Sequence, residues 1–466
     1  MIRKTVRWIG LLLAAWLVFI VLCGILPPLH HPGVSESSRT AAALRLEAPA
    51  ENTGERILNI ETNPEALIWR LRAIEAAQDR IILSTFDFDD DGSGRDVMAA
   101  LQAAARRGVK IQIIIDGING LYSWISGPAL HALAVEPNVE MRFYNPINLF
   151  RPWQLSYRLH DKYLIVDDFL YILGGRNTND LFLGDYMERP NYDRDILVWR
   201  PQDAENSSGE DLEKYFDAVW TLQDNKRVGR ATAKTARTAA ELEAHYRTLP
   251  ETYPEAFEPV DWEAVTHPVN SITLWTNPIG EESKAPELWK ALYQRMQEGS
   301  DVLIQTPYIV CNREMYDDLA RLSEGRRLRI LTNAVANGAN PFGCTDYLNN
   351  KKKILATGSE VFEVNTSISS HTKTILVDDR WSMVGSYNLD MRSTYLNTEL
   401  MLMIDSPELN AELRGYMDEL ESRSNHVMPD GTETPGEKYT AVEPGLLKKL
   451  LYLVMRIITL PVRHLL

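Results

Sequence analysis

The pattern of apolar and polar residues begins with one long apolar segment. An uncharged run of 19 residues extends from Trp8 to Leu26 and is closed by Pro27 and Pro28. As a helix this run rises about 28 Å, close to the hydrocarbon thickness of a bilayer. A signal peptide usually has a shorter apolar region and a small-residue cleavage site, which this segment lacks. The pattern therefore predicts a retained transmembrane anchor over residues 1–28.

Beyond the anchor, a regular pattern of apolar residues, and with it the expected folded structure, begins near Ile57. Residues 29–57 lack a clear apolar period and are predicted to form a tether. Beyond them, buried-type apolar runs alternate with amphipathic segments, which predicts an α/β fold. In the first half we expect strands at 80–88, 110–116 and 139–145, and a helix at 97–108.

The second half repeats this order. We expect helices at 287–299 and 315–325, and strands at 301–310, 327–333 and 361–365. The repetition predicts an internal duplication with lobes at 58–200 and 270–406, joined by a charged connector at 201–269. The remaining region, 407–466, is expected to be helical.

The end of that region has a pattern of its own. Residues 445–466 are strongly apolar, with Lys448, Lys449, Arg456 and Arg463 spaced so that they share one side of a helix. This favours an interfacial helix whose basic stripe meets anionic lipid headgroups. The alternative is a helix packed on its own domain with solvated lysines.

Composition narrows the function classes. The chain is 45% hydrophobic and 24% charged, as in folded proteins, and its net charge of −15 argues against a general nucleic-acid binder. Three cysteines are too few for a disulfide framework, and their spacing does not indicate zinc. Cys311 and Cys344 are expected to be free thiols, with pairing in an oxidising compartment as the alternative.

The candidate chemistry lies in a segment that occurs twice. HDKYLIVDD (160–168) recurs as HTKTILVDD (371–379), and each copy is followed by a second apolar run that ends in GGRN or GSYN. The shared residues are His160, Lys162, Asp167 and Asn177 in the first copy and His371, Lys373, Asp378 and Asn388 in the second.

Strand geometry predicts how these residues meet. Each histidine lies two positions from its lysine and so shares a face with it, whereas Asp167 and Asp378 are expected to support a turn or the backbone. A hairpin register that pairs Val166 with Tyr171 opposes Lys162 to Gly175 and His160 to Asn177. The same register opposes Lys373 to Ser386 and His371 to Asn388, with Gly174 and Gly385 leaving room for a ligand.

These residue types suit phosphoryl transfer. Lysine and asparagine side chains from both copies can bind a tetrahedral anion and stabilise transition-state charge, so no metal or other cofactor is expected. One neutral imidazole can attack phosphorus while the other, protonated, donates to the leaving alcohol. The two histidines therefore need environments that split their pKa values.

The repeated motif HxKx4Dx6G[GS]xN resembles the double HKD signature of the phospholipase D superfamily, and the chain is similar to bacterial cardiolipin synthases of the type C group. The similarity extends to FYNPINLFRP (143–152), GGRNTND (174–180), YDRDILV (192–198) and GSYNLDMRSTYLNTE (385–399). It implies two phospholipase D-like lobes with the site at their interface. It also implies a phosphohistidine intermediate on His160, with His371 as general acid and later as base.

The resemblance further implies that a carboxylate of the other repeat orients each histidine. Glu399 is the expected partner of His160. For His371 we expect Asp195, with Asp193 as the rival, and either acid could instead be a solvated loop residue.

The predicted reaction is phosphatidyl transfer between phospholipids, which forms cardiolipin from phosphatidylglycerol. Phosphatidylethanolamine is a further candidate substrate. A hydrolytic phospholipase D differs only in using water as acceptor. A nuclease is disfavoured by the pI near 5.2 and the membrane segment. A non-catalytic lipid-binding scaffold has no need of two histidines in register.

Charges around the anchor predict its orientation. Arg3, Lys4 and Arg7 precede the apolar run, whereas Arg39, offset by Glu36, is the first cation after it. The positive-inside rule then predicts a cytoplasmic N-terminus and a catalytic domain outside the cytoplasm, at the cell membrane.

Overall fold

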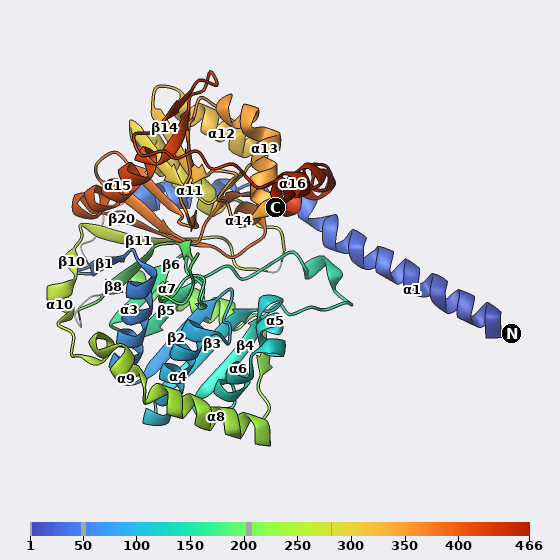
Figure 1. The fold of residues 1–466 in the computed structure, drawn as a ribbon, viewed down its shortest axis with the longest axis vertical. Coiled ribbons are helices and arrows are strands. Elements are labelled where there is room, and N and C mark those ends of the chain that lie inside the picture. Colours follow the sequence, from blue (N-terminus) through green and yellow to red (C-terminus); the bar gives the residue numbers. More distant parts are fainter. Residues whose placement is uncertain (1, 48–52, 202–206, 281) are drawn as a thin grey trace.

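Two nine-stranded mixed sheets form the centres of two lobes, one in each half of the chain (Figure 1). The computed structural model describes residues 2–47, 53–201, 207–280 and 282–466. In the first sheet the strand order is β10 (His267–Pro268), β1 (Arg56–Ile60), β8 (Asp195–Trp199), β6 (Leu170–Gly174), β5 (Tyr163–Val166), β2 (Arg80–Thr85), β3 (Lys110–Asp116), β4 (Val139–Tyr144) and β9 (Lys226–Val228). In the second it is β11 (Ser271–Thr276), β20 (Leu400–Asp405), β18 (Trp381–Gly385), β17 (Thr374–Val377), β12 (Asp301–Gln305), β14 (Arg327–Asn333), β15 (Glu360–Val364), β21 (Ser424–Val427) and β22 (Glu433–Pro435).

The two sheets share one topology. In the first sheet β2, β3 and β4 are parallel, and β5, β6 and β8 are antiparallel to their neighbours. The second sheet repeats this with β12, β14 and β15 parallel and β17, β18 and β20 antiparallel. The predicted α/β fold with an internal duplication is confirmed.

The repeating unit is longer than the sequence pattern indicated. The strand β9 pairs with β4 at the far edge of the first sheet, and β21 pairs with β15 at the equivalent place in the second, where β22 adds the edge strand. Equivalent helices, α7 (Ser208–Trp220) and α15 (Pro407–Ser422), precede these strands. The units therefore run from 56 to 228 and from 271 to 427, so much of the predicted connector belongs to the first lobe. Residues 202–206 of that connector lie outside the described residues.

Helices cover the sheets. In the first lobe they are α3 (Asn63–Ala76), α4 (Gly92–Arg107), α5 (Asn119–Ser126), α6 (Pro128–Leu133), α8 (Ala233–Tyr246), α9 (Leu249–Thr252) and α10 (Trp262–Val265). In the second they are α11 (Glu287–Glu298), α12 (Arg313–Ser323), α13 (Pro341–Leu355), α14 (Met391–Tyr395) and α16 (Leu446–Ile458).

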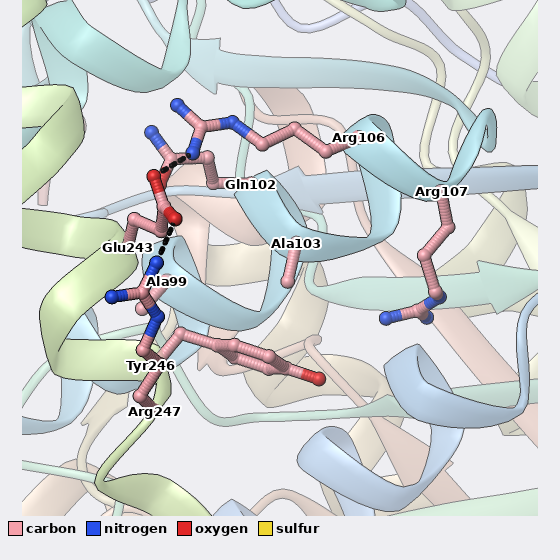
Figure 2. Close-up of a pocket in the computed structure, with 8 residues that line it drawn as sticks. All are labelled: Ala99, Gln102, Ala103, Arg106, Arg107, Glu243, Tyr246 and Arg247. Atoms are coloured by element: carbon pink, nitrogen blue, oxygen red, sulfur yellow. Dashed lines mark hydrogen bonds and ion pairs between the residues drawn. The ribbon is translucent and has the colours of Figure 1, made fainter.

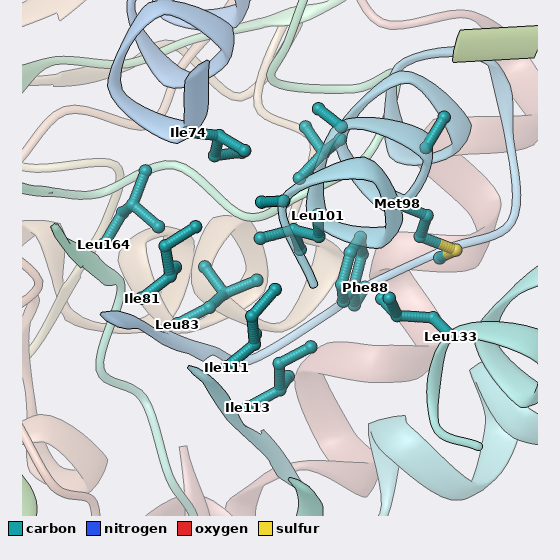
Figure 3. Packing of buried hydrophobic residues seen from close by; sticks show 14 of the residues in the cluster. Ile74, Ile81, Leu83, Phe88, Met98, Leu101, Ile111, Ile113, Leu133 and Leu164 are labelled. Carbon is teal, nitrogen blue, oxygen red and sulfur yellow. The ribbon is translucent and has the colours of Figure 1, made fainter. Parts of the chain in front are cut away.

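Local sequence fixes the ends of these elements. Helix α4 begins after Asp91, whose carboxylate accepts from the Gly94 N–H at 3.0 Å, and ends at Gly108 in a left-handed conformation. Its apolar face packs on the branched side chains of β2 and β3, and Figure 3 shows Leu101 above Ile81 and Ile111. A third cluster of buried residues is shared between the lobes and joins Tyr163 and Leu303, among others, into one core.

Helix α8, from the predicted connector, packs on α4. Glu243 accepts from Arg106 Nη1 at 2.7 Å and also from Arg247, as Figure 2 shows. The small side chains Ala99 and Ala103 leave a cavity of about 310 Å³ beneath this ion-pair network. The cavity has no histidine in its lining, so it is separate from the repeated motif.

The N-terminal segment forms a helix that extends away from the lobes (Figure 1). Helix α1 spans Ile2–Ile25, and Thr5–Leu29 is the one segment of the described chain that is long and apolar enough to cross a membrane. The predicted tether contains a helix, α2 (Glu36–Glu47), which packs on α11. Leu46 is buried there and its carbonyl accepts from Arg295 Nη2 at 3.0 Å, so this part is docked on the second lobe. Residues 48–52 of the tether lie outside the described residues.

The orientation of α16 differs from the prediction. Two of its basic residues contact the second lobe: Lys448 donates to the Ala336 carbonyl at 2.8 Å and Arg456 Nε to Asn349 Oδ1 at 2.8 Å. Lys449 is exposed and pairs with Glu443 at 2.7 Å. Beyond the helix, Arg463 forms an ion pair with Asp346. The face directed outward is apolar, with Leu447 82% exposed. The prediction that all four cations form a stripe directed at headgroups is therefore wrong, because the lobe supplies partners for Lys448, Arg456 and Arg463.

Candidate active site

Two hairpins, β5–β6 and β17–β18, carry the repeated motif. Val166 pairs with Leu170, and Val377 pairs with Trp381, so the predicted register is wrong by one residue. The turn is one residue shorter than expected because Asp167 and Asp378 adopt left-handed conformations, with φ of 47° and 48°.

The side chains of these two aspartates hold the backbone. The Asp167 carboxylate accepts from the N–H groups of residues 78, 79 and 80 at 2.7–2.9 Å. Asp378 Oδ1 accepts from the N–H groups of Ser300 and Asp301 at 2.8 and 2.9 Å. Both residues lie at the far end of the hairpin from the histidines, and the expectation that they support a turn agrees with these contacts.

His160 is oriented across the interface between the lobes. Its Nδ1 lies 2.9 Å from Glu399 Oε1, and its backbone N–H donates to Thr398 Oγ1 at 3.0 Å. Glu399 is fully buried and also accepts from Ser386 Oγ at 2.5 Å and Ser393 Oγ at 2.6 Å. The contact between His160 and Glu399 that the family resemblance implies is present.

His371 is oriented by Asp193, not by Asp195. Its Nδ1 donates to Asp193 Oδ2 at 2.7 Å, and its backbone N–H donates to the Tyr192 carbonyl at 2.6 Å. The latter bond extends a short parallel pairing between β7 (Asn191–Tyr192) and β16 (Ser369–Ser370), which joins the two lobes. The predicted choice of Asp195 is corrected by this geometry.

Asp195 has other partners inside the first lobe. It begins β8 and lies 2.9 Å from Arg70 Nη2 and 3.4 Å from Arg176 Nη1. A Cβ on Gly174 would lie 2.1 Å from the Asp195 carboxylate. Gly174 therefore makes room for β8, and Gly385 likewise approaches the Leu400 carbonyl of β20, so neither leaves room for a ligand as predicted.

The small residues that follow these glycines contact the orienting carboxylates. A Cβ on Gly175 would lie 2.3 Å from Asp193 Oδ1, and Ser386 in the second copy donates to Glu399. The sequence interpretation assigned both to substrate binding. The structure instead places them behind the histidines, where they fit the two acids.

Both lysines are buried beside their histidines. Lys162 Nζ donates to the His160 carbonyl at 2.6 Å, and Lys373 Nζ donates to the His371 carbonyl and lies 3.5 Å from Asp193. Burial lowers the pKa of Lys162 to about 8, which leaves the ammonium mostly charged at neutral pH. Two buried ammonium groups beside the two histidines can therefore bind an anionic ligand.

The asparagines reveal two residues that the sequence interpretation missed. Asn177 Nδ2 donates to Asp87 Oδ2 at 3.0 Å, and Asn388 Nδ2 donates to Tyr308 Oη at 3.1 Å. Asp87 and Tyr308 occupy equivalent positions just beyond β2 and β12, in TFDF (85–88) and TPYI (306–309). Aligning these strand ends with the repeat would have identified both. Both asparagine Oδ1 atoms are buried and have no hydrogen-bond partner among the described residues.

The electrostatic environments of the two histidines differ. Burial, reinforced by Lys162 and Lys373, holds the pKa of His160 well below its usual range, and burial lowers that of His371 to about 4. Burial raises the pKa of Glu399 to about 7. Burial alone would raise the pKa of Asp193, but Lys373 and His371 outweigh it and lower that pKa to about 2. His371 therefore faces a permanent anion, whereas His160 faces an acid that is half protonated near pH 7.

Asp87 adds a further titratable group. Burial, together with the nearby Asp89, raises its pKa to about 7. The site thus combines cationic donors with an acidic side chain. Among the described residues there is no cluster of three or more His, Cys, Asp or Glu side chains that could hold a metal, and all three cysteines are free.

Comparisons with known proteins agree with this geometry. Residues 71–220 and 292–421, more than half of the chain, match the family described as cardiolipin synthase, PLD-like domain. The chain is 27% identical to cardiolipin synthase C of Escherichia coli over 391 residues, which is 75% of this chain and 81% of that protein. It is 26% identical to cardiolipin synthase A of Proteus mirabilis, over 90% of this chain and 80% of that protein.

A solved structure has the same fold. The phosphatidylserine synthase of Haemophilus influenzae superposes with a TM-score of 0.61 at 17% identity and covers 91% of this chain and 98% of its own. The two-lobed arrangement is therefore shared with a solved protein over nearly its full length.

Proposed function

Because the chain belongs to the cardiolipin synthase, PLD-like domain family and is a phospholipase D-type enzyme, we propose that it transfers a phosphatidyl group from one phospholipid to the alcohol of another. The preferred reaction forms cardiolipin and glycerol from two molecules of phosphatidylglycerol. The observation that carries the proposal is the pair of histidines, each bonded through Nδ1 to a carboxylate of the opposite lobe. Neither Nε2 has a hydrogen-bond partner among the described residues, so both can face a phosphodiester.

In the first step His160 Nε2 attacks phosphorus and the bond to the leaving glycerol oxygen breaks. His371 gives its proton to that oxygen, and Glu399 accepts the N–H bond of the phosphorylated imidazole. In the second step His371 takes the proton of an incoming lipid hydroxyl, whose oxygen displaces His160 from phosphorus. Lys162 and Lys373 stabilise the charge on the phosphoryl oxygens throughout.

The different environments of the two histidines support this division of roles. Asp193 remains ionised at neutral pH and stabilises an imidazolium at His371, which suits a general acid. The strongly lowered pKa of His160 keeps that ring neutral, which suits a nucleophile. A bound phosphodiester adds negative charge and favours protonation of His371 on substrate binding.

Hydrogen-bond acceptors in the site support a lipid alcohol as acceptor substrate. Asp87 and the unsatisfied amide oxygens of Asn177 and Asn388 can accept from hydroxyl groups such as those of a glycerol headgroup. Water could also donate to these acceptors, so the identity of the product distinguishes transfer from hydrolysis.

Vesicles of phosphatidylglycerol test the reaction. We expect cardiolipin and free glycerol in equal amounts. Phosphatidic acid as the dominant product would establish the hydrolase instead, and cleavage of DNA at a comparable rate would establish a nuclease. Repeating the assay with added phosphatidylethanolamine reports whether that lipid also serves as a substrate.

The membrane position belongs to the same proposal. The positive-inside rule applied to Arg3, Lys4 and Arg7 puts the lobes outside the cytoplasm, with the outward apolar face of α16 lying on the bilayer surface. Alkaline phosphatase fused after residue 440 should then be active. A reporter that functions only in the cytoplasm should be silent at the same position, and the reverse pattern would overturn this topology.

A further inference from the structure

The segment that leads into the first catalytic motif forms a closed loop at 146–153. Asn145 closes its base, because Nδ2 donates to the carbonyls of Gln154 and Tyr157 at 2.8 and 2.9 Å. Arg158 Nη2 donates to the Asn145 carbonyl at 2.5 Å. His160 follows two residues later, so the base of the loop is tied to the site.

This loop lies along the anchor helix. At its base Ser156 Oγ donates to the Gly24 carbonyl at 3.0 Å, and toward its tip the Phe150 ring lies 5.7 Å from the ring of Trp16. Trp16 and Gly24 are separated by about 12 Å along a helix. The loop therefore runs back along α1, away from the lobes (Figure 1). That direction points into the bilayer when α1 spans it.

The chemistry of the loop suits lipid. The side chains of Ile147, Leu149, Phe150 and Trp153 are exposed by 44%, 50%, 80% and 41%. Four large apolar side chains in eight residues are unusual for a surface in water and indicate an apolar partner.

Several polar groups near the tip have partners within the protein. The N–H of Phe150 donates to Asn148 Oδ1 at 3.0 Å, and the N–H of Arg151 donates to the Asn148 carbonyl at 3.0 Å. The Arg151 guanidinium pairs with Asp224 at 2.8 Å. Backbone at membrane depth requires internal partners of this kind.

Helix α5 extends the same apolar surface. Gly117, two residues before this helix, lies against Pro146 at the start of the loop. On α5 the side chains of Tyr122 and Ile125 are 75% and 79% exposed.

We propose that the loop 146–153 inserts into the bilayer beside α1, flanked by α5, and holds the catalytic site at the level of the lipid headgroups. The partner is the lipid bilayer itself, because the loop contacts the helix that crosses it. The proposal rests on the proposed function in that the lipids at this surface are the substrates.

Depth-dependent fluorescence quenching tests the position of the loop without requiring turnover. Phe150→Cys, in full-length protein that also carries Cys23→Ser, is labelled with an environment-sensitive dye and reconstituted in phosphatidylglycerol vesicles. The matched control is Tyr416→Cys, an exposed site on α15. This helix lies on the side of the lobes away from α1 (Figure 1). We expect acyl-chain nitroxide lipids to quench the label at 150 and not at 416. Equal quenching of both labels by aqueous iodide would overturn the proposal.

Turnover on two forms of the substrate provides a second test. Phe150→Asp should lower turnover on vesicles by about tenfold or more, since an apolar anchor becomes charged, but change turnover on soluble short-chain phosphatidylglycerol less than about twofold. Tyr416→Asp should leave both rates unchanged. Equal losses on both substrates, in a variant whose thermal unfolding matches that of the wild type, would contradict insertion. Absence of cardiolipin from the wild-type protein would refute the proposed function, whereas the quenching result would still decide the position of the loop.

Discussion

Replacing Asp193 with asparagine tests whether this acid, and not Asp195, supports the general acid. At a charge separation of about 4 Å and an effective dielectric constant of about 20, the carboxylate stabilises an imidazolium by about 4 kcal/mol. Since about 1.4 kcal/mol changes a rate tenfold, Asp193→Asn should lower kcat on phosphatidylglycerol by roughly 10³. The backbone N–H of Arg194 donates to Asp193 Oδ1 at 2.8 Å, and asparagine retains an oxygen that can accept this hydrogen bond. The loss should therefore reflect charge and orientation more than folding.

A donor with p-nitrophenol in place of glycerol isolates the protonation step. This leaving group departs without a proton, so the burst of p-nitrophenolate that accompanies phosphorylation of His160 should slow less than about tenfold in Asp193→Asn. Steady-state transfer to a lipid alcohol should remain slow, because His371 must still deprotonate the acceptor.

The matched control is Asp195→Asn. This change removes a buried partner of Arg70 and Arg176 and should lower the free energy of unfolding by about 3–5 kcal/mol. Measured well below the unfolding temperature, its kcat should stay near that of the wild type. Retention of more than a tenth of wild-type kcat by Asp193→Asn, or a larger loss in Asp195→Asn, would refute the assignment.

Three further predictions follow from the same contacts. His160→Ala and His371→Ala should each lower turnover by several orders of magnitude, with acid-trapped phosphate on His160 in the wild type; more than about a tenth of the rate in either variant would rule out the two-histidine mechanism. The pKa of Glu399 is raised from 4.5 to about 7, so the folded state retains a proton that the unfolded state releases, and this contribution to stability is lost as pH rises from about 4.5 to about 7. Glu399→Gln should remove that dependence, worth about 3 kcal/mol, and equal pH slopes of thermal unfolding in both proteins would contradict it. Asp167→Ala and Asp378→Ala should each lower the free energy of unfolding by roughly 3 kcal/mol in urea titrations, because backbone N–H groups lose their acceptor, without altering the rate per folded molecule; a change below about 0.5 kcal/mol would disprove this role.

The fold could be predicted largely because its central strands are buried on both faces. The predicted strands at 110–116 and 327–333 match β3 and β14 residue for residue. Each is a short apolar run that follows a glycine- or arginine-containing turn. Such a run can be assigned as a strand from the local sequence, without knowledge of tertiary contacts. The duplication was visible for the same reason. The true length of the repeat was not visible, because β9 and β21, which complete the two units, are strands of three and four residues that carry little sequence signal.

Details of the site depended on contacts that sequence does not encode locally. The hairpin register was misjudged because it depends on the left-handed conformation of Asp167, which shortens the turn. The choice between Asp193 and Asp195 depended on a two-residue strand pairing across the lobes. Both acids follow the same motif at similar spacing, so only the pairing partner distinguishes them. The orientation of α16 likewise depended on Asp346 and the carbonyl of Ala336, far away in sequence.

The pairing of β7 with β16 also restricts how substrates arrive. The backbone of His371 is bonded to Tyr192 of the other lobe, and a shared core lies behind both hairpins. Separating the two lobes by a hinge motion would break the same contacts that orient His371, the proposed general acid. Under the proposed function, two-chain lipids would then reach and leave a site of fixed shape by lateral diffusion in the membrane plane. Turnover should then respond to the fluidity and packing of the surrounding lipids more than to any hinge in the protein.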